Sequence, residues 1–185
     1  MQSKKNIFAI IGSAGKNSSN VKLVQKIAAL TSDVFTINIF EGLSTLPHFD
    51  PALSIENTPQ IIVDLRNAIQ QADGVIICTP EYVFSIPAGL KNAIEWCVST
   101  TVFSKKPVGL ITASASGLKG HEELKLIMQT IETIFTGETT LLVHGIKGKV
   151  DAHGNITDKA TNDAIQNFAT AFAKLVDDVA DKYQA

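Results

Sequence analysis

A short polar loop at residues 12–20, Gly-Ser-Ala-Gly-Lys-Asn-Ser-Ser-Asn, carries residue types suited to binding an anion. The loop follows an apolar run at 7–11 and precedes a helical pattern that begins near Val21. Glycines let the backbone approach a ligand, serine hydroxyls donate hydrogen bonds, and a helix N-terminus offers free N–H groups and a positive dipole end. This combination favours a phosphate group. The alternative is a polar turn in which Ser18 or Ser19 only caps the helix.

Two further loops combine hydroxyl, aromatic and small residues. Residues 79–87 read Thr-Pro-Glu-Tyr-Val-Phe-Ser-Ile-Pro, and residues 114–120 read Ser-Ala-Ser-Gly-Leu-Lys-Gly. Tyr82 and Phe84 offer aromatic rings beside a backbone stiffened by proline. The glycines of the other loop permit a close approach to a ligand. Each loop follows an apolar, strand-like run, as the first loop does.

Strand-like and helix-like patterns alternate along the whole chain. We expect five strands, at about 6–11, 34–40, 74–79, 107–113 and 139–144. A helical pattern of apolar residues follows each strand. Alternating strands and helices predict an α/β fold with a parallel sheet, helices on both faces and right-handed crossovers. Five strands favour the order 2-1-3-4-5 of a flavodoxin-like three-layer sandwich, with residues 1–185 forming a single domain.

The sequence also predicts particular helix boundaries. Thr58 is expected to cap the second helix, with Pro59 as its first residue. The third helix should begin near Pro87 and carry Val98 on its apolar face. The fourth helix should run from about 120 to 135.

Composition and charge restrict the class of protein. The 185 residues are 45% hydrophobic and 18% charged, with a net charge of −2. These values fit a compact globular protein, and the scattered charges argue against nucleic acid or an anionic membrane surface as the main partner. No apolar run approaches the roughly 18 residues that a membrane span needs, and the N-terminus is typical of the start of a strand rather than a signal peptide.

The cysteines and histidines indicate neither a disulfide framework nor a metal site. Cys78 and Cys97 lie in apolar segments without a CxxC pattern, which favours reduced, buried thiols and a cytoplasmic location. The four histidines have no metal-ligand spacing, so we expect no metal. His121 follows the loop at 114–120 directly and is the histidine whose role most needs a test.

A parallel sheet would bring the three loops to one edge, outside the carboxyl ends of the strands, where ligands bind in such folds. A flat heteroaromatic ligand with a phosphate tail would satisfy all three loops, and FMN fits best. The dinucleotide pattern GxGxxG is absent. The phosphate-loop pattern GxxxxGK[ST] is absent too, because Lys16 follows Gly12 too soon and Asn17 replaces the hydroxyl residue. Nucleoside triphosphate chemistry is therefore disfavoured.

The loop residues resemble the motifs of the NADPH-dependent FMN reductase family, which includes flavin, quinone, azo-dye and chromate reductases. The first loop matches the family pattern Gly-Ser-x-Arg-x-x-Ser-x-Asn at Gly12, Ser13, Ser18 and Asn20. The second matches Pro-Glu-Tyr-Asn-x-Ser-x-Pro at Pro80, Glu81, Tyr82, Ser85 and Pro87. The third is similar to Ser-x-Ser-x-Gly-x-x-Gly at Ser114, Ser116, Gly117 and Gly120. The resemblance covers roughly residues 5–175.

This resemblance implies FMN as the cofactor and NADPH or NADH as the co-substrate. The implied cofactor-binding residues are Ser13, Lys16, Ser18, Ser19, Asn20, Pro80, Glu81, Tyr82, Val83, Ser85, Ser114, Ser116 and Gly117. A hydride would pass from NAD(P)H to FMN, and a small acceptor such as a flavin, quinone or azo compound would be reduced in the same place. We expect no catalytic side chain, because the cofactor carries the chemistry.

The resemblance also implies a homodimer or homotetramer, formed partly through the third and fourth helices. The sequence pattern predicts that Ile94, Trp96 and Val98 offer more apolar surface than one helix stripe needs. Glu81 has an alternative role as a structural or subunit-interface partner rather than a ligand contact.

Two positions depart from the family pattern. Gly15 stands where the family usually has a phosphate-binding arginine, with Lys16 as the nearest substitute, and Val83 stands where it usually has asparagine. The departures predict a weaker affinity for FMN. They also leave open a flavodoxin-like electron carrier or a non-catalytic FMN-binding or interaction protein. Electron carriers are usually strongly acidic, which a net charge of −2 does not suggest.

Overall fold

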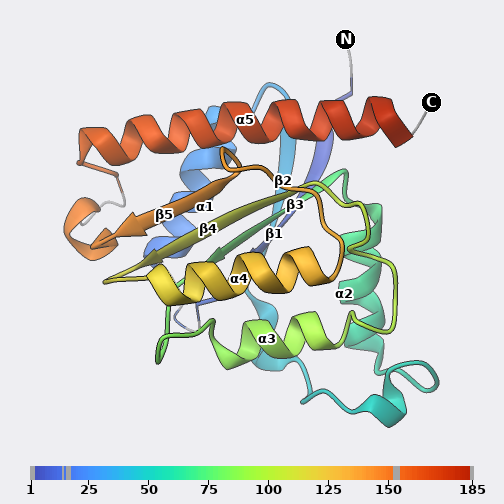
Figure 1. The fold of residues 1–185 in the computed structure, drawn as a ribbon. Helices are drawn as coiled ribbons and strands as arrows, with labels where there is room; N and C mark the ends of the chain where they lie inside the picture. Colours follow the sequence, from blue (N-terminus) through green and yellow to red (C-terminus); the bar gives the residue numbers. More distant parts are fainter. Residues whose placement is uncertain (1–2, 14, 16–17, 152–154, 184–185) are drawn as a thin grey trace.

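The computed structural model describes residues 3–13, 15, 18–151 and 155–183 (Figure 1). Its strands form one parallel sheet of order β2-β1-β3-β4-β5, which confirms the flavodoxin-like topology. The strands are β1 (Lys5–Ile11), β2 (Phe35–Phe40), β3 (Gly74–Thr79), β4 (Val108–Ser114) and β5 (Thr140–His144). The α-helices are α1 (Ser19–Leu30), α2 (Gln60–Gln71), α3 (Ala88–Glu95), α4 (Leu118–Thr130) and α5 (Lys159–Tyr183). In the central pairing, Ile7 of β1 lies opposite Gly74 of β3.

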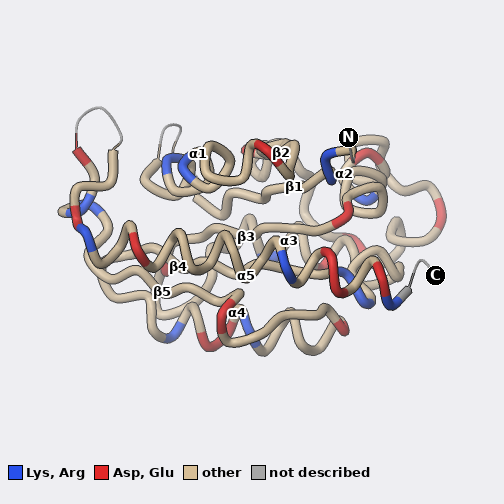
Figure 2. Tube along the Cα trace, turned by 90° about the horizontal axis from the view of Figure 1, so that it is seen from above, with Lys and Arg blue, Asp and Glu red and all other residues tan. Residues whose placement is uncertain are grey.

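The sheet is the middle of three layers (Figure 1). Apolar residues of α1 and α5 pack on one face, and apolar residues of α2, α3 and α4 pack on the other. The central strand β3 is buried along its whole length, which explains why its sequence is a continuous apolar run rather than an alternating one. Figure 2 shows acidic and basic positions mixed over the surface helices, in keeping with the small net charge.

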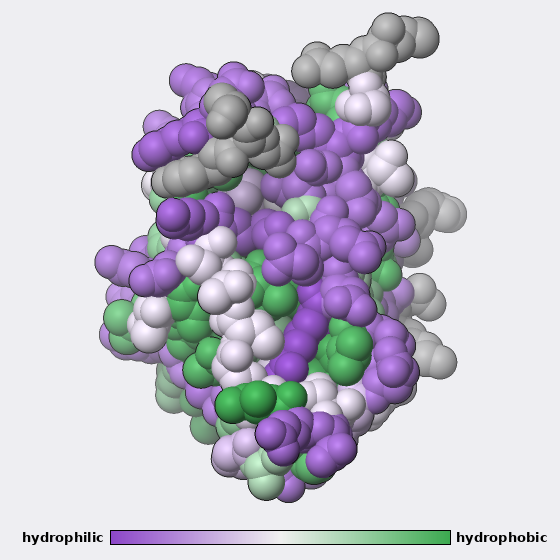
Figure 3. Space-filling model, turned by 90° about the vertical axis from the view of Figure 1, so that its right-hand side faces the viewer, coloured by the Kyte–Doolittle hydropathy of each residue, from purple (hydrophilic) through white to green (hydrophobic). Residues whose placement is uncertain are grey.

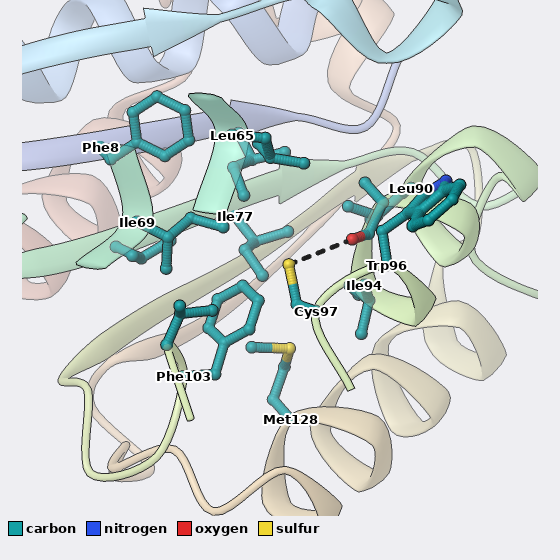
Figure 4. Packing of buried hydrophobic residues seen from close by; sticks show 14 of the residues in the cluster. Phe8, Leu65, Ile69, Ile77, Leu90, Ile94, Trp96, Cys97, Phe103 and Met128 are labelled. Carbon is teal, nitrogen blue, oxygen red and sulfur yellow. Dashed lines mark hydrogen bonds between the residues drawn. The ribbon is translucent and has the colours of Figure 1, made fainter. Parts of the chain in front are cut away.

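The core below the sheet contains one of the two cysteines. Figure 4 shows Cys97 among Ile77, Phe103 and Met128, with its thiol donating to the carbonyl oxygen of Ala93 at 3.4 Å. Burial raises the pKa of the Cys97 thiol to about 12 and also raises the pKa of the buried Cys78 thiol. Both cysteines are free and buried, as expected, and neither has the thiolate character of a nucleophile.

The predicted boundary of the second helix is wrong by one residue. Pro59 occupies the N-cap position and α2 begins at Gln60. The Thr58 hydroxyl does not cap the helix but donates to the carbonyl oxygen of Leu53 at 2.8 Å. The fourth helix also differs from the prediction, because α4 already ends at Thr130.

The apolar surface expected on the third helix is mostly absent. α3 ends at Glu95, Val98 lies beyond it with 62% of its surface exposed, and Ile94 and Trp96 are buried. The Trp96 indole N–H donates to the carbonyl oxygen of Pro47 at 2.8 Å, so this side chain fastens the connection between β2 and α2 instead of facing outward. The prediction of an apolar face made of these three residues is therefore wrong for two of them.

Within the described ranges, no helix combines the length and apolarity needed to span a bilayer.

Candidate functional site

A cavity of about 650 Å³ lies at the edge of the sheet where the strands end. Its lining residues come from the segments that follow β1, β3, β4 and β5. They are Ser13, Ser18, Ser19, Asn20, Pro80, Tyr82, Ala113, Ser114, Ala115, Gly145, Ile146, Lys147 and Gly148. The structure thus brings together predicted residues from all three loops, at the point where the strand order reverses between β1 and β3.

The first loop starts in close contact with β3. The Gly12 N–H donates to the carbonyl oxygen of Cys78 at 2.8 Å, and a Cβ at Gly12 would lie 2.2 Å from the Thr79 Oγ1. Ser18 is the N-cap of α1, where its Oγ accepts from the Val21 N–H at 3.4 Å. The capping role that the sequence left open for Ser18 is therefore present, beside a cavity that the same residue lines. The predicted residue Lys16 lies outside the described residues.

Asn20 connects the start of α1 to two strands from a buried position. Its Nδ2 donates to the carbonyl oxygen of Ala113 at 3.5 Å, and its Oδ1 accepts from the Cys78 thiol at 3.3 Å. These contacts hold the N-terminus of α1 over the ends of β3 and β4. The position of the serine hydroxyls near the cavity depends on this tie.

The second loop forms a two-residue hairpin from Tyr82 to Ser85. The two residues exchange backbone hydrogen bonds of 2.9 and 3.0 Å, and Val83 and Phe84 between them have φ angles of 52° and 58°. Two consecutive positive φ angles are typical of a type I′ turn, which favours asparagine and glycine. Val83 is 95% exposed and Phe84 76% exposed, whereas Tyr82 lines the cavity. The Phe84 ring is therefore exposed and is not among the residues that line the cavity.

Replacing Val83 with asparagine is expected to stabilise the fold by about 1 kcal/mol. A β-branched side chain is strained at positive φ, whereas asparagine adopts this region readily. Because Val83 is almost fully exposed, the substitution removes little packing. Urea unfolding of Val83→Asn against the unmodified chain measures the gain. A loss of stability would contradict the strain argument.

Two carboxylates connect the second loop to α4. The Glu81 carboxylate accepts from the backbone N–H groups of Gly117 at 3.1 Å and Gly120 at 2.8 Å, at the start of α4. In the other direction, the Glu123 carboxylate of α4 accepts from the Ile86 N–H at 3.1 Å. The Glu81 side chain thus satisfies helix N–H groups that lack intrahelical partners. The described contacts therefore support a structural role for Glu81 rather than a contact with a ligand.

The remaining predicted residues within the described ranges are not among those that line the cavity. They are Glu81, Val83, Ser85, Ser116 and Gly117. Gly117, with a φ angle of 90°, forms the N-cap of α4, and a Cβ there would lie 2.9 Å from Leu142 Cδ1. Ser116 is exposed, and the Ser85 hydroxyl donates to the carbonyl oxygen of Ile86 at 3.3 Å.

His121 has a structural environment. Its ring is buried, and Nδ1 lies 3.0 Å from the Thr112 Oγ1. Burial, together with the positive charge of Lys125, lowers the pKa of His121 to about 4, against a smaller opposing effect of Glu122. The imidazole is therefore neutral near pH 7 and is not a poised proton donor.

The His121 environment predicts an acid-sensitive stability. The unfolded state, with a histidine pKa near 6.5, binds more protons than the folded state between about pH 6.5 and 4, so stability falls as the pH drops through this window. We expect this group alone to remove about 2 kcal/mol. Urea unfolding at about pH 7 and pH 4.5 should show the loss in the unmodified chain and less of it in His121→Asn. Equal losses in both proteins would exclude His121 as the source.

The segment after β5 was missed by the sequence reasoning. Gly145, Ile146, Lys147 and Gly148 all line the cavity, and the Gly145 N–H donates to the carbonyl oxygen of Ser114 at 2.8 Å. The available signal was a lysine in a glycine-flanked turn, directly after the fifth strand and hence at the same sheet edge as the other loops.

A second cavity, of about 360 Å³, lies at the opposite edge, where the strands begin. The face at this end of the molecule is mostly hydrophilic in its upper part (Figure 3). Lys106 lines this cavity, but its ammonium group donates to the carbonyl oxygens of Gln70 at 3.1 Å and Ala72 at 2.6 Å, at the end of α2. That contact is a helix C-cap and not a ligand site. No cluster of potential metal ligands occurs within the described ranges.

The sheet order and a cavity at the reversal point define a protein of the flavodoxin-like class. The family model described as NADPH-dependent FMN reductase matches residues 5–147, and the chain belongs to this family. A quinone reductase of Escherichia coli K12 is 29% identical over 184 residues, covering 95% of this chain and 97% of the relative. The NADH-dependent flavin reductase subunit 2 of Lactobacillus johnsonii is 28% identical, covering 92% and 97%.

A solved structure agrees with these sequence relationships. The flavoenzyme FerB of Paracoccus denitrificans, an NAD(P)H:(acceptor) oxidoreductase, superimposes with a TM-score of 0.83 at 25% identity. The match covers 94% of this chain and 98% of FerB. The family and the fold expected from the loop motifs are therefore confirmed.

Proposed function

We propose that the chain is an FMN-dependent NAD(P)H oxidoreductase that reduces quinones or similar small acceptors at the 650 Å³ cavity. The main support for this proposal is that the same cavity is lined by a hydroxyl-rich helix N-terminus and by an aromatic side chain. Ser13, Ser18 and Ser19 suit a phosphate, and Tyr82 beside Pro80 suits a flat ring. The volume lies within the range of about 300–1,000 Å³ that is usual for cofactor sites.

The chain's own residues bind and orient in this proposal. When bound, FMN supplies a ring that takes up a hydride from NAD(P)H and passes two electrons to the acceptor. Asn20 fixes the start of α1 at the cavity, and Glu81 fixes the hairpin against α4. We assign no acid or base role to His121, because its ring is neutral and faces Thr112.

We extend the proposed site beyond the lining residues. Glu81, Val83, Ser85, Ser116 and Gly117 belong to the same two loops. The backbone N–H groups of Val83 and Ser116 would face the polar rim of the ring, because those of Tyr82, Ser85 and Gly117 donate within the protein. Such groups favour negative charge on a bound ring without changing position during the reaction. Lys16 stays a proposed phosphate contact on sequence grounds alone.

The relatives support the class of acceptor and co-substrate. The Escherichia coli relative is a quinone reductase, the Lactobacillus relative is an NADH-dependent flavin reductase, and FerB uses NAD(P)H. We therefore propose a quinone or flavin as the acceptor, with either nicotinamide as the hydride donor.

Assembly and location are also proposed. We propose that residues 1–185 act as one FMN-binding domain within a homodimer or homotetramer, supported by the exposed apolar side chains of Phe84, Val98, Leu118 and Leu126. The two free, buried thiols support a reducing cytoplasmic environment, where NAD(P)H is also present. The mixed surface charge supports a small-molecule partner rather than nucleic acid.

A direct test uses the purified full chain. It should retain FMN through gel filtration and oxidise NADH or NADPH when a benzoquinone is supplied. An electron carrier would retain FMN but fail to oxidise NAD(P)H without a separate reductase. A protein that retains no flavin and shows no flavin-dependent oxidation of NAD(P)H would overturn the proposal.

A further inference from the structure

We propose that Lys147 supplies a positive charge that binds the phosphate group of FMN, an inference that rests on the proposed function. Lys147 lies in the segment after β5, far along the chain from the serine loop. Both segments nevertheless line the same cavity. The serine loop contributes Ser13, Ser18 and Ser19, and the segment after β5 contributes Lys147. The fold thus brings a cation to the cavity that contains the candidate phosphate donors.

Charge balance makes this juxtaposition relevant. A phosphate monoester carries about −1.5 to −2 charges near pH 7. Serine hydroxyls are neutral, and a helix N-terminus contributes only about half a positive charge. Among the described residues that line the cavity, Lys147 is the one with a charged side chain. Among these lining residues, Lys147 would therefore be the one that neutralises the charge of a bound phosphate.

The ammonium group of Lys147 is available for such a contact. The side chain is exposed and has no ion pair within the described part of the chain. The neighbouring Lys149 differs, because its ammonium group lies 3.6 Å from an Asp158 carboxylate oxygen. Basic positions are visible just beyond the end of β5 in Figure 2.

The backbone of this segment is held at the cavity. The Gly145 N–H donates to the carbonyl oxygen of Ser114 at 2.8 Å, and the Gly148 N–H donates to that of Gly145 at 3.0 Å. Gly145 has a φ angle of 63°, which favours glycine at this position. The turn therefore keeps Lys147 at the cavity that the serine loop also lines.

The consequence is a preference for phosphorylated flavins. FMN and riboflavin share the same ring and differ at the phosphate, so a residue that contacts only the phosphate changes the affinity for FMN alone. Lysine is an effective point charge for phosphate even without the two-pronged geometry of arginine.

Flavin titrations of the full chain test this inference. Lys147→Met should weaken FMN binding about tenfold while changing riboflavin binding less than about twofold, as expected for loss of one charge-assisted contact. Lys147→Arg should stay near the unmodified chain. Lys174→Met, an exposed lysine of α5 with the same charge change, serves as the matched control and should leave both affinities unchanged. FMN binding by Lys147→Met should also depend less steeply on ionic strength.

Several results would overturn the inference. Unchanged FMN affinity in Lys147→Met excludes the contact, and parallel losses for FMN and riboflavin show a general disturbance of the cavity. Unchanged FMN affinity combined with a higher KM for NADPH but not NADH assigns Lys147 to the nucleotide phosphate instead. If the unmodified chain binds neither flavin, the proposed function itself fails, which is distinguishable from failure at Lys147 alone.

Discussion

Gly12→Ala is expected to destabilise the fold by about 3 kcal/mol and to weaken FMN binding sharply. A Cβ at this position would lie 2.2 Å from Thr79 Oγ1 and 2.6 Å from Thr79 Cβ. Thr79 is fully buried at the end of β3, so it has no solvent-filled space into which it can move. Relief requires the serine loop or β3 to shift, and either movement displaces the hydroxyls that line the cavity.

The neighbouring Gly15 supplies the control for this prediction. Gly15 is exposed, and a Cβ there would approach only Ser13 Oγ, at 4.0 Å. Gly15→Ala should therefore change the free energy of unfolding by less than about 0.5 kcal/mol. Urea unfolding measures both variants, and fluorescence titration measures their FMN affinities. A Gly12→Ala protein as stable as Gly15→Ala would contradict the packing of Gly12 against Thr79.

The strands were predictable because each has a short apolar or β-branched sequence pattern that favours a strand. Residues 74–79 form a short apolar run rich in β-branched residues, which is typical of a strand buried on both faces, and β3 spans the same residues. The other strands lie within one or two residues of their expected positions. The alternation of strands and helices then leaves few topologies, so the order of the sheet also followed from the sequence.

Helix ends were less predictable because distant residues fix them. The third helix ends at Glu95, where the next carbonyl group, that of Trp96, accepts from the Arg66 Nε of α2 at 2.8 Å. The same guanidinium donates to the carbonyl oxygen of Ser54 at 2.9 Å. An apolar pattern continuing to Val98 contains no information about Arg66, which lies 30 positions before Trp96.

The three loops converge for a reason that the sequence contains, because parallel strands end at one edge of a sheet. What each side chain does in those loops depends on long-range partners. Lys147 was missed because a lysine in a glycine-flanked turn is common on protein surfaces, and only the packing of the segment against Ser114 brings it to the cavity. The family motif places Glu81 among the ligand contacts, whereas in the structure its carboxylate accepts from backbone N–H groups at the start of α4.

Glu81→Ala is expected to cost about 2–3 kcal/mol of stability and to lower FMN affinity as well. The substitution leaves the N–H groups of Gly117 and Gly120 without their carboxylate acceptor at a partly buried helix start. The hairpin that carries Tyr82 then loses its connection to α4 on this side, so the aromatic part of the site becomes less ordered. Glu81→Gln keeps one acceptor oxygen and should cost about half as much.

Two glutamates of α4 separate this effect from a general loss of charge. Glu123→Ala removes the hydrogen bond to the Ile86 N–H and should give a smaller loss in the same direction. Glu122→Ala removes an exposed ion pair with Lys119, and at neutral pH its stability should stay close to that of the unmodified chain. In the double variant Glu81→Ala/Glu123→Ala, a loss of FMN affinity larger than the sum of the single losses would show that the two carboxylates hold the hairpin jointly. If the losses of FMN affinity are strictly additive and riboflavin binding is unaffected, the role of Glu81 is limited to capping α4.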